Sequence, residues 1–122
     1  MPQLIPKAAC IQAAGNKPKQ IHEYVGRVNS ATSDVSVAHM ISPGGWVEPG
    51  QRPEFTEYTI VLRGTLRVEH ELGDAMEVHA GQGIITMPGE WVRYSTPGDD
   101  GAEYIAVCTP AFSANRVIRD ND

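Results

Sequence analysis

The feature that most constrains the fold of this chain is the regular interruption of short strand-like runs by glycine and proline. The 122 residues include 12 glycines and 9 prolines, and the runs between them are rich in Val, Ile, Thr and Tyr, which favour strands. No stretch of a dozen residues repeats its apolar positions with the 3.6-residue period of a helix. Many short strands separated by turns are typical of a β-sandwich or β-barrel, so the pattern predicts an all-β fold.

The strand-like runs also divide the chain into three parts. We expect a β-barrel over residues 20–112, preceded by an arm over 1–19 that is able to add a strand to a neighbouring subunit, and followed by a loose polar tail over 113–122. Arg63-Gly64 separates two runs, where the glycine suits a tight hairpin. The predicted strands are 20–28, 34–41, 57–62, 65–71, 76–79, 83–86, 91–95 and 103–108.

Charge and composition exclude several classes of partner. The net charge is −5 and the ten Lys and Arg residues form no basic stripe, which argues against binding a nucleic-acid backbone. No apolar run approaches the roughly 20 residues of a membrane-spanning helix, and the first ten residues lack the apolar core of a signal peptide. The two cysteines, Cys10 and Cys108, make no disulfide framework. We therefore expect a cytoplasmic protein that binds neither nucleic acid nor membrane.

Two blocks of the sequence show a similar succession of glycine or proline turns and strand-like runs. In the first, Pro49-Gly50 opens the block and Glu57 stands seven residues before Gly64; in the second, residues 81–92 contain Gly81, Gly83 and a joined Pro88-Gly89. These blocks resemble the paired motifs of the cupin superfamily, and the resemblance covers about residues 34–110. It implies a double-stranded β-helix, that is, a jelly-roll barrel. The chain also resembles a bacterial group of small cupins without an assigned function and, more distantly, the ethanolamine-utilisation cupins.

The positions that hold the metal in many cupins differ in this chain. The resemblance places the first-motif histidines at Gln51 and Pro53 and the second-motif histidine at Val92, and of the usual ligands it retains only Glu57. Because imidazole is the ligand that suits transition metals, we expect no metal and no other cofactor. A divalent cation that prefers oxygen ligands is the alternative, and its candidate ligands are Gln51, Glu54 and Glu57.

The alternation of side chains along strands predicts which residues face the barrel interior. The mixture of one carboxyl group, a phenol, hydroxyls and apolar walls is typical of a small-molecule pocket. The interior residues predicted in this way, with Gln51 at the mouth, are Gln51, Glu57, Thr59, Val61, Val92, Tyr94 and Thr96. His39 is a further candidate, although a lone histidine among apolar residues is more often part of the core.

Glu57 and Tyr94 are the candidate catalytic residues. A carboxyl group inside a partly dry barrel is suited to proton transfer, and the Tyr94 hydroxyl can donate a hydrogen bond to a substrate oxygen. The alternatives are a Glu57 whose charge is satisfied by Tyr94 or by solvent, and a Tyr94 that packs as a core aromatic.

The sequence is compatible with three functions. It does not decide whether the protein is an enzyme. The first is binding of a small polar organic molecule, with metal-independent acid–base catalysis of the isomerase, lyase or cyclase type by Glu57. The second is a non-catalytic ligand-binding or accessory domain, and the third is a divergent metalloenzyme. An apolar strand face and the N-terminal arm further predict a homodimer.

Overall fold

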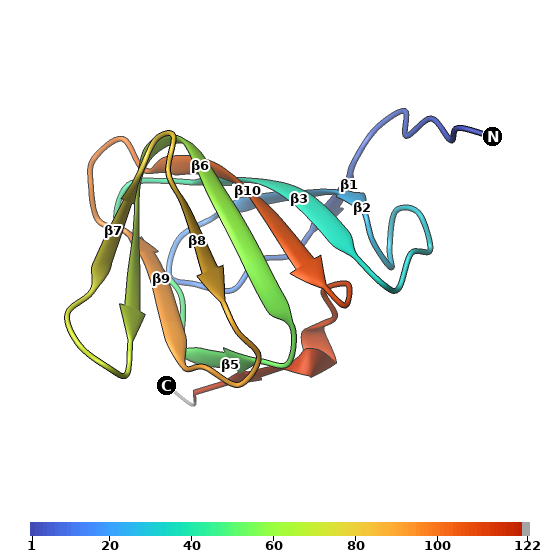
Figure 1. The fold of residues 1–122 in the computed structure, drawn as a ribbon. Helices are drawn as coiled ribbons and strands as arrows, with labels where there is room; N and C mark the ends of the chain where they lie inside the picture. The colour runs from blue at the N-terminus through green and yellow to red at the C-terminus, as the bar shows by residue number, and fades with distance from the viewer. Residues whose placement is uncertain (121–122) are drawn as a thin grey trace.

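The computed structural model describes residues 1–120, which form an almost all-β structure (Figure 1). The only helix among these residues is a 3-10 turn, η1, over Ala114–Arg116. The strands are β1 (Ala9–Ile11), β2 (Gln20–Val25), β3 (Ser36–Ser42), β4 (Trp46–Val47), β5 (Gln51–Pro53), β6 (Thr56–His70), β7 (Met76–His79), β8 (Gly83–Thr86), β9 (Val92–Thr96), β10 (Ala102–Thr109) and β11 (Val117–Arg119).

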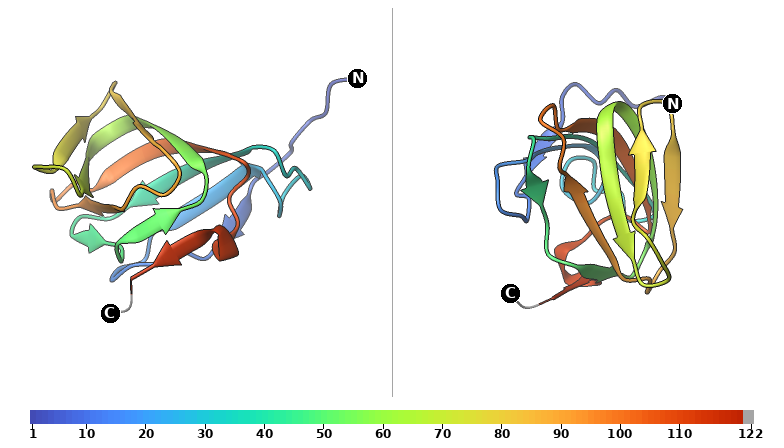
Figure 2. Two further views of the ribbon diagram at one scale, coloured as in Figure 1. Left: turned by 60° about the horizontal axis from the view of Figure 1, so that its bottom comes forward. Right: turned by 90° about the vertical axis from the view of Figure 1, so that its left-hand side faces the viewer.

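The strands pair antiparallel in the order β1-β2-β3-β10-β6-β9-β5-β11. β4 adds to β9, and β7 and β8 both add to β6. The sheet curls around a common interior, which is visible in the two views of Figure 2. This arrangement confirms the predicted all-β, jelly-roll type of fold.

Strand β6 is central because its two halves belong to different sides of the barrel. Its first half pairs with β10 and β8, and its second half pairs with β7 and β9. The predicted hairpin at Arg63-Gly64 is wrong: the chain continues through these residues as one strongly curved strand (Figure 1), with a bulge in its pairing to β10. Gly64 has a φ of +76°, and a Cβ there would lie 2.1 Å from the carbonyl oxygen of Gly101. Glycine therefore allows the close approach of β10 rather than a chain reversal.

The packed core lies where the middle and second half of β6 meet β4, β7, β9 and β10. Trp46 and Val61 are fully buried, and Leu66, Val68 and Val92 are 1% exposed. These side chains form one hydrophobic cluster, so this part of the interior is filled with apolar groups.

The N-terminal segment lies against the chain's own barrel. β1 pairs with β2 of the same chain. One edge of β1 is therefore hydrogen-bonded within the chain. Beyond β1, the indole Nε1 of Trp46 donates a hydrogen bond to the carbonyl oxygen of Ala14 (3.1 Å), and the amide of Asn16 donates one to Val47 (3.1 Å). Residues 9–19 thus form part of the barrel wall.

The C-terminal segment differs from the loose tail expected over residues 113–122. β11 pairs with β5, with Val117 opposite Pro53, and the red segment runs beside β5 in Figure 1. The amide of Asp120 donates to the carbonyl oxygen of Gly50 (2.8 Å), while its carboxylate accepts a hydrogen bond from Trp91 (3.0 Å). Pairing with an otherwise open strand edge satisfies the backbone groups of the segment. Residues 121 and 122 lie outside the described part.

A membrane-spanning helix is absent from residues 1–120, none of whose helices has the necessary length and apolar character.

Candidate functional site

The barrel interior contains a cavity of about 80 Å³ that adjoins the packed core, with which it shares Leu66, Tyr94 and Tyr104. Its walls come from the N-terminal segment with β1 and β2, from β3, β5, β6, β9 and β10, and from the C-terminal segment with β11. Apolar walls are formed by residues such as Ile21, Met40, Phe55, Ala106 and Phe112, and the polar groups that argue for a site are Lys19, Glu48, Gln51, Glu57, Tyr94 and Tyr104. An apolar cavity with a few convergent polar groups is typical of a small-molecule site.

The structure brings four of the predicted site residues together. Gln51, Glu57, Thr59 and Tyr94 all line this cavity. Glu57 and Thr59 do so because they alternate with the exposed Tyr58 along β6.

Three other predicted pocket residues are buried but do not line the cavity. Val61 and Val92 belong to the packed hydrophobic cluster. Thr96 is fully buried, and its Oγ1 donates a hydrogen bond to the carbonyl oxygen of Pro43 (2.7 Å). Alternation identified the inward face correctly, but these residues sit further along the barrel, where side chains fill the interior.

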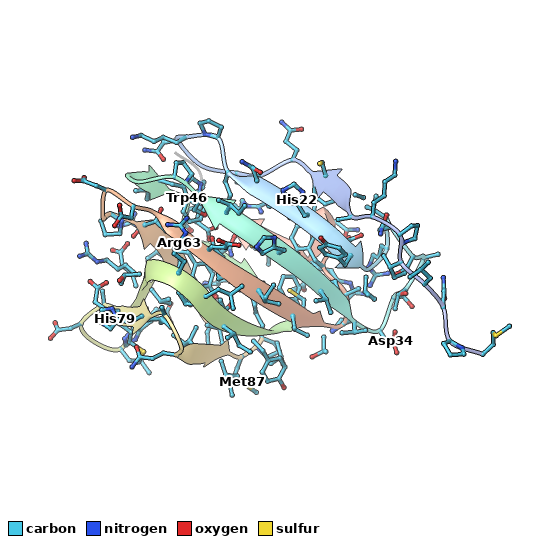
Figure 3. All side chains as sticks on the ribbon, turned by 90° about the horizontal axis from the view of Figure 1, so that it is seen from above. His22, Asp34, Trp46, Arg63, His79 and Met87 are labelled. Carbon is cyan, nitrogen blue, oxygen red and sulfur yellow. The ribbon has the colours of Figure 1, made fainter. Side chains whose placement is uncertain are left out.

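The expectation that His39 belongs to the pocket requires correction. On β3 the residues that line the cavity are Ser36, Ala38 and Met40, so His39 lies on the opposite, outer face. Its Nε2 is 2.6 Å from Oε2 of Glu103. The hydrogen bond from His39 lowers the pKa of that carboxyl group. Figure 3 looks onto this outer face of the sheet.

The residues proposed for a divalent cation are not brought together either. Gln51 and Glu57 line the cavity, but Glu54 is exposed and lies outside it. Across residues 1–120, no group of three or more His, Cys, Asp or Glu side chains is arranged to hold a metal ion. The donor set of this cavity therefore does not fit the metal that many cupins bind.

Glu48 is a polar residue of the site that the sequence analysis missed. It follows β4 directly and is 8% exposed, with its carboxyl group in the cavity wall. Burial raises its pKa to about 7, an effect that the nearby charge of Lys19 opposes and that of Glu57 reinforces. The sequence signal that could have revealed it is the two-residue period of a strand, which places Glu48 on the same face as the large apolar Trp46.

Lys19 supplies a positive charge from the N-terminal segment. Its Nζ lies 4.3 Å from the ring centroid of Trp46 and 5.2 Å from that of Tyr104, which places the ammonium over two aromatic faces. Burial acts to lower the pKa of Lys19, but Tyr104, Glu48 and Glu57 together raise it above its usual value. Lys19 is therefore a cation in the site and not a free amine.

The hydroxyl and thiol groups of the site stay protonated. Burial raises the pKa of Tyr94 well above its ordinary value, and the charge of Glu57 adds to this effect. The Tyr94 hydroxyl is 3.2 Å from Oγ1 of Thr86. Burial also raises the pKa of the Cys108 thiol, whose Sγ donates to Oε2 of Glu57 (3.5 Å). Tyr94 is thus suited to donate a hydrogen bond, and Cys108 is not an activated nucleophile.

The comparison with protein families identifies the class of this chain. The family model described as Cupin domain matches residues 38–108, more than half of the chain. The chain therefore belongs to the cupin family, as its two sequence blocks indicated.

Two solved structures share its fold at low sequence identity. The polyketide cyclase RemF from Streptomyces resistomycificus superposes with a TM-score of 0.79 at 15% identity, covering 100% of this chain and 87% of RemF. The EutQ protein of Clostridium difficile superposes with a TM-score of 0.63 at 20% identity, covering 76% of this chain and 63% of EutQ. At these identities the likeness shows the fold alone.

One curated relative is closer in sequence. It is named endoribonuclease YbeY and comes from Myxococcus xanthus (strain DK1622); it is 43% identical over 94 residues, which cover 77% of this chain. The match spans only 32% of that protein's length, so about two thirds of the relative have no counterpart in the aligned region.

Proposed function

We propose that this cupin binds a small polar organic molecule in its cavity and catalyses a metal-independent proton transfer on it, with Glu57 as acid or base and Tyr94 as hydrogen-bond donor. The observation that carries the proposal is the convergence of both side chains on one mostly apolar cavity. General acid–base chemistry requires a carboxyl group that reaches the substrate and a donor that stabilises developing negative charge. Glu57 and Tyr94 supply both without a metal ion, in keeping with a cavity wall to which the described residues contribute no imidazole.

Hydrogen–deuterium exchange tests this proposal whatever the net reaction is. A library of small hydroxy and carbonyl compounds is incubated with the protein in D2O, and deuterium uptake at carbon is followed by NMR. We expect uptake into a compound that binds, and a loss of about hundredfold or more in Glu57→Gln, because a general base contributes that much. Glu54→Gln, at an exposed position outside the cavity, is the matched control. An unchanged exchange rate in Glu57→Gln would exclude Glu57 as the base.

A non-catalytic accessory domain is the second candidate function. The observation that favours it is the 43% identity to one third of a much longer protein named as an endoribonuclease, in which the matched region need not be the part that performs the chemistry. Calorimetric binding of a compound whose deuterium uptake stays at the uncatalysed rate would favour this function over catalysis.

We further propose that the outer face of the sheet binds a second copy of the chain. The register aligns apolar residues from neighbouring strands into a row across this face: Ile85, Tyr58, Val107, Val37 and Val25. Ile60 and Leu62 are 54% and 51% exposed beside it. The row contains no charged side chain, so two copies can meet about a twofold axis without like-charge repulsion.

Light scattering coupled to size exclusion tests the dimer. The wild type is expected at twice the monomer mass, and Ile60→Lys at the monomer mass, because a charge would be buried unpaired in the interface. Leu72→Lys is the control, since Leu72 is 92% exposed in the turn between β6 and β7. A wild type that elutes as a monomer at all concentrations contradicts the proposal.

A cytoplasmic location is also proposed. Both cysteines are free, with Cys10 exposed and Cys108 buried, and free thiols are typical of a reducing compartment.

A further inference from the structure

The cavity wall contains two buried side-chain oxygens that have no hydrogen-bond partner. Within residues 1–120, Oε2 of Glu48 and Oε1 of Gln51 are the atoms of this kind. Glu48 is 8% exposed and Gln51 7%, and both residues border the same cavity. Because buried polar groups in native proteins are almost always hydrogen-bonded, two unmatched acceptors on one cavity indicate a place where a bound molecule supplies the donors.

Several other polar groups of the cavity already have hydrogen-bond partners within the chain. The hydroxyls of Tyr94 and Tyr104 pair with Thr86 (3.2 Å) and Ser42 (2.8 Å). Glu23 also borders the cavity, but its Oε2 accepts the backbone amides of Val28 and Asn29, each at 3.0 Å. The buried oxygens of Glu48 and Gln51 therefore still need hydrogen-bond donors.

The charges around the two acceptors argue for a neutral molecule. Lys19 and Arg119 bring positive charge to the cavity, and Glu48 and Glu57 bring negative charge, as does Glu23, whose Oε2 is already bound by two backbone amides. An ammonium ligand would enter next to Lys19, which already interacts with both carboxyl groups. A carboxylate ligand would place further acceptor oxygens against Glu48 and Gln51.

We infer that Glu48 and Gln51 form a recognition site for a neutral compound that carries two hydrogen-bond donors, such as neighbouring hydroxyls, on an apolar body. The inference rests on the proposed function, since it specifies the ligand of the same cavity. The donors bind the two buried oxygens, and the apolar body contacts the walls formed by residues such as Met40, Phe55 and Phe112. Glu48 and Gln51 thereby select the ligand, and Glu57 and Tyr94 act on it.

A series of probes with one common ring tests the ligand class. cis-1,2-Cyclohexanediol offers two donors, cyclohexanol one, 1,2-dimethoxycyclohexane none, cyclohexanecarboxylate a negative charge and cyclohexylamine a positive charge. Each is titrated into 15N-labelled protein at pH 8, where Glu48 is mostly ionised because its pKa is about 7. Each lost donor is expected to weaken binding about tenfold, since an unsatisfied buried acceptor costs that much. The diol is expected to bind best, with shifts at cavity residues.

Substitution of the acceptors separates recognition from a purely structural role. Gln51→Leu removes the unmatched oxygen, so it is expected to retain or raise the Tm while weakening diol binding about tenfold or more. Gln3→Leu, at an exposed position in the N-terminal segment, is the matched control and is expected to leave diol binding unchanged. Glu48→Gln, which keeps the size of the side chain, is expected to weaken diol binding as well.

The outcomes distinguish this inference from the proposed function. Tighter binding of the carboxylate or the amine than of the diol overturns the inference and leaves a ligand cavity with Glu57 intact. Equal binding of the diol to wild type and Gln51→Leu also overturns it. If no probe of the series binds, the inference is overturned, and the deuterium-exchange screen still decides the proposed function on its own.

Discussion

Two adjoining parts of the barrel interior, which we call the packed end and the hollow end, are both buried but differ in chemistry. At the packed end Trp46, Val61 and Val68 belong to one hydrophobic cluster, which reaches the cavity wall through Tyr94 and Tyr104. At the hollow end Glu48 and Gln51 are also buried, at 8% and 7% exposure, yet they border a cavity and present oxygens without partners. Burial alone therefore does not distinguish a core from a site: what distinguishes them is whether the buried groups satisfy each other.

The two parts of the interior also contribute differently to the stability of the fold and to ligand binding. Burying apolar surface stabilises the fold by roughly 25 cal/mol per Å², whereas an unsatisfied buried polar group costs about 1–3 kcal/mol. The packed end thus offsets the cost of the hollow end. Substitutions at the packed end should destabilise the fold, and substitutions at the hollow end should alter ligand binding with little loss of stability or with a gain.

The largest expected effect is at the packed end. Trp46→Ala should lower the free energy of unfolding by about 4 kcal/mol, because a fully buried indole leaves a large void. Urea unfolding measures this change. Trp91→Ala is the control: Trp91 is only partly buried, and its loss should be clearly smaller. A loss below about 1 kcal/mol at Trp46 would mean that this end is not the main source of stability.

The next effect is at the hollow end and depends on pH. The pKa of Glu48 rises from 4.5 to about 7 on folding, so the folded state binds this proton more tightly than the unfolded state. The stability that this group contributes is present at low pH and is lost as pH rises from 4.5 to 7. Relative to Glu48→Gln, the free energy of unfolding of the wild type should fall by about 3 kcal/mol between pH 4.5 and pH 8.

Urea unfolding of both proteins at the two pH values measures this difference. Glu77→Gln provides the control, since the side chain of Glu77 is 38% exposed. The difference in unfolding free energy between this variant and the wild type should not change comparably with pH. Parallel pH dependence in wild type and Glu48→Gln would show that Glu48 is solvated rather than buried, and would remove the contrast between the two ends.

The smallest effect is expected on the barrel surface. Nε of Arg67 donates to Oε1 of Glu77 at 2.9 Å across β6 and β7, and both side chains are well exposed. Arg67→Ala should cost about 0.5 kcal/mol, because solvent screens such pairs. Salt titration of the unfolding free energy checks this: the difference between variant and wild type should shrink toward zero at high salt. A cost above about 2 kcal/mol would show that charge on this surface matters as much as burial.

Much of the site was predictable because alternation is a local property. The sequence indicated Glu57, Thr59 and Tyr94 as interior residues from the period of two, and the structure places them at the cavity. The same rule chose the wrong face for His39, because apolar neighbours on β3 were taken to mark the inside. Here the outer face of the sheet is the apolar one, as the exposed Tyr58 and Ile60 also show.

The sequence by itself determined the all-β class, the cupin spacing from Pro49-Gly50 to Gly64, and the loss of imidazole at the usual ligand positions. Only the tertiary structure decided which interior positions are packed and which border a cavity, and that Lys19 meets Glu48 and Gln51 there. The physical reason is that strand periodicity depends on neighbouring residues. Whether a buried group finds a partner depends instead on segments that are distant in the chain and that meet only when the sheet closes.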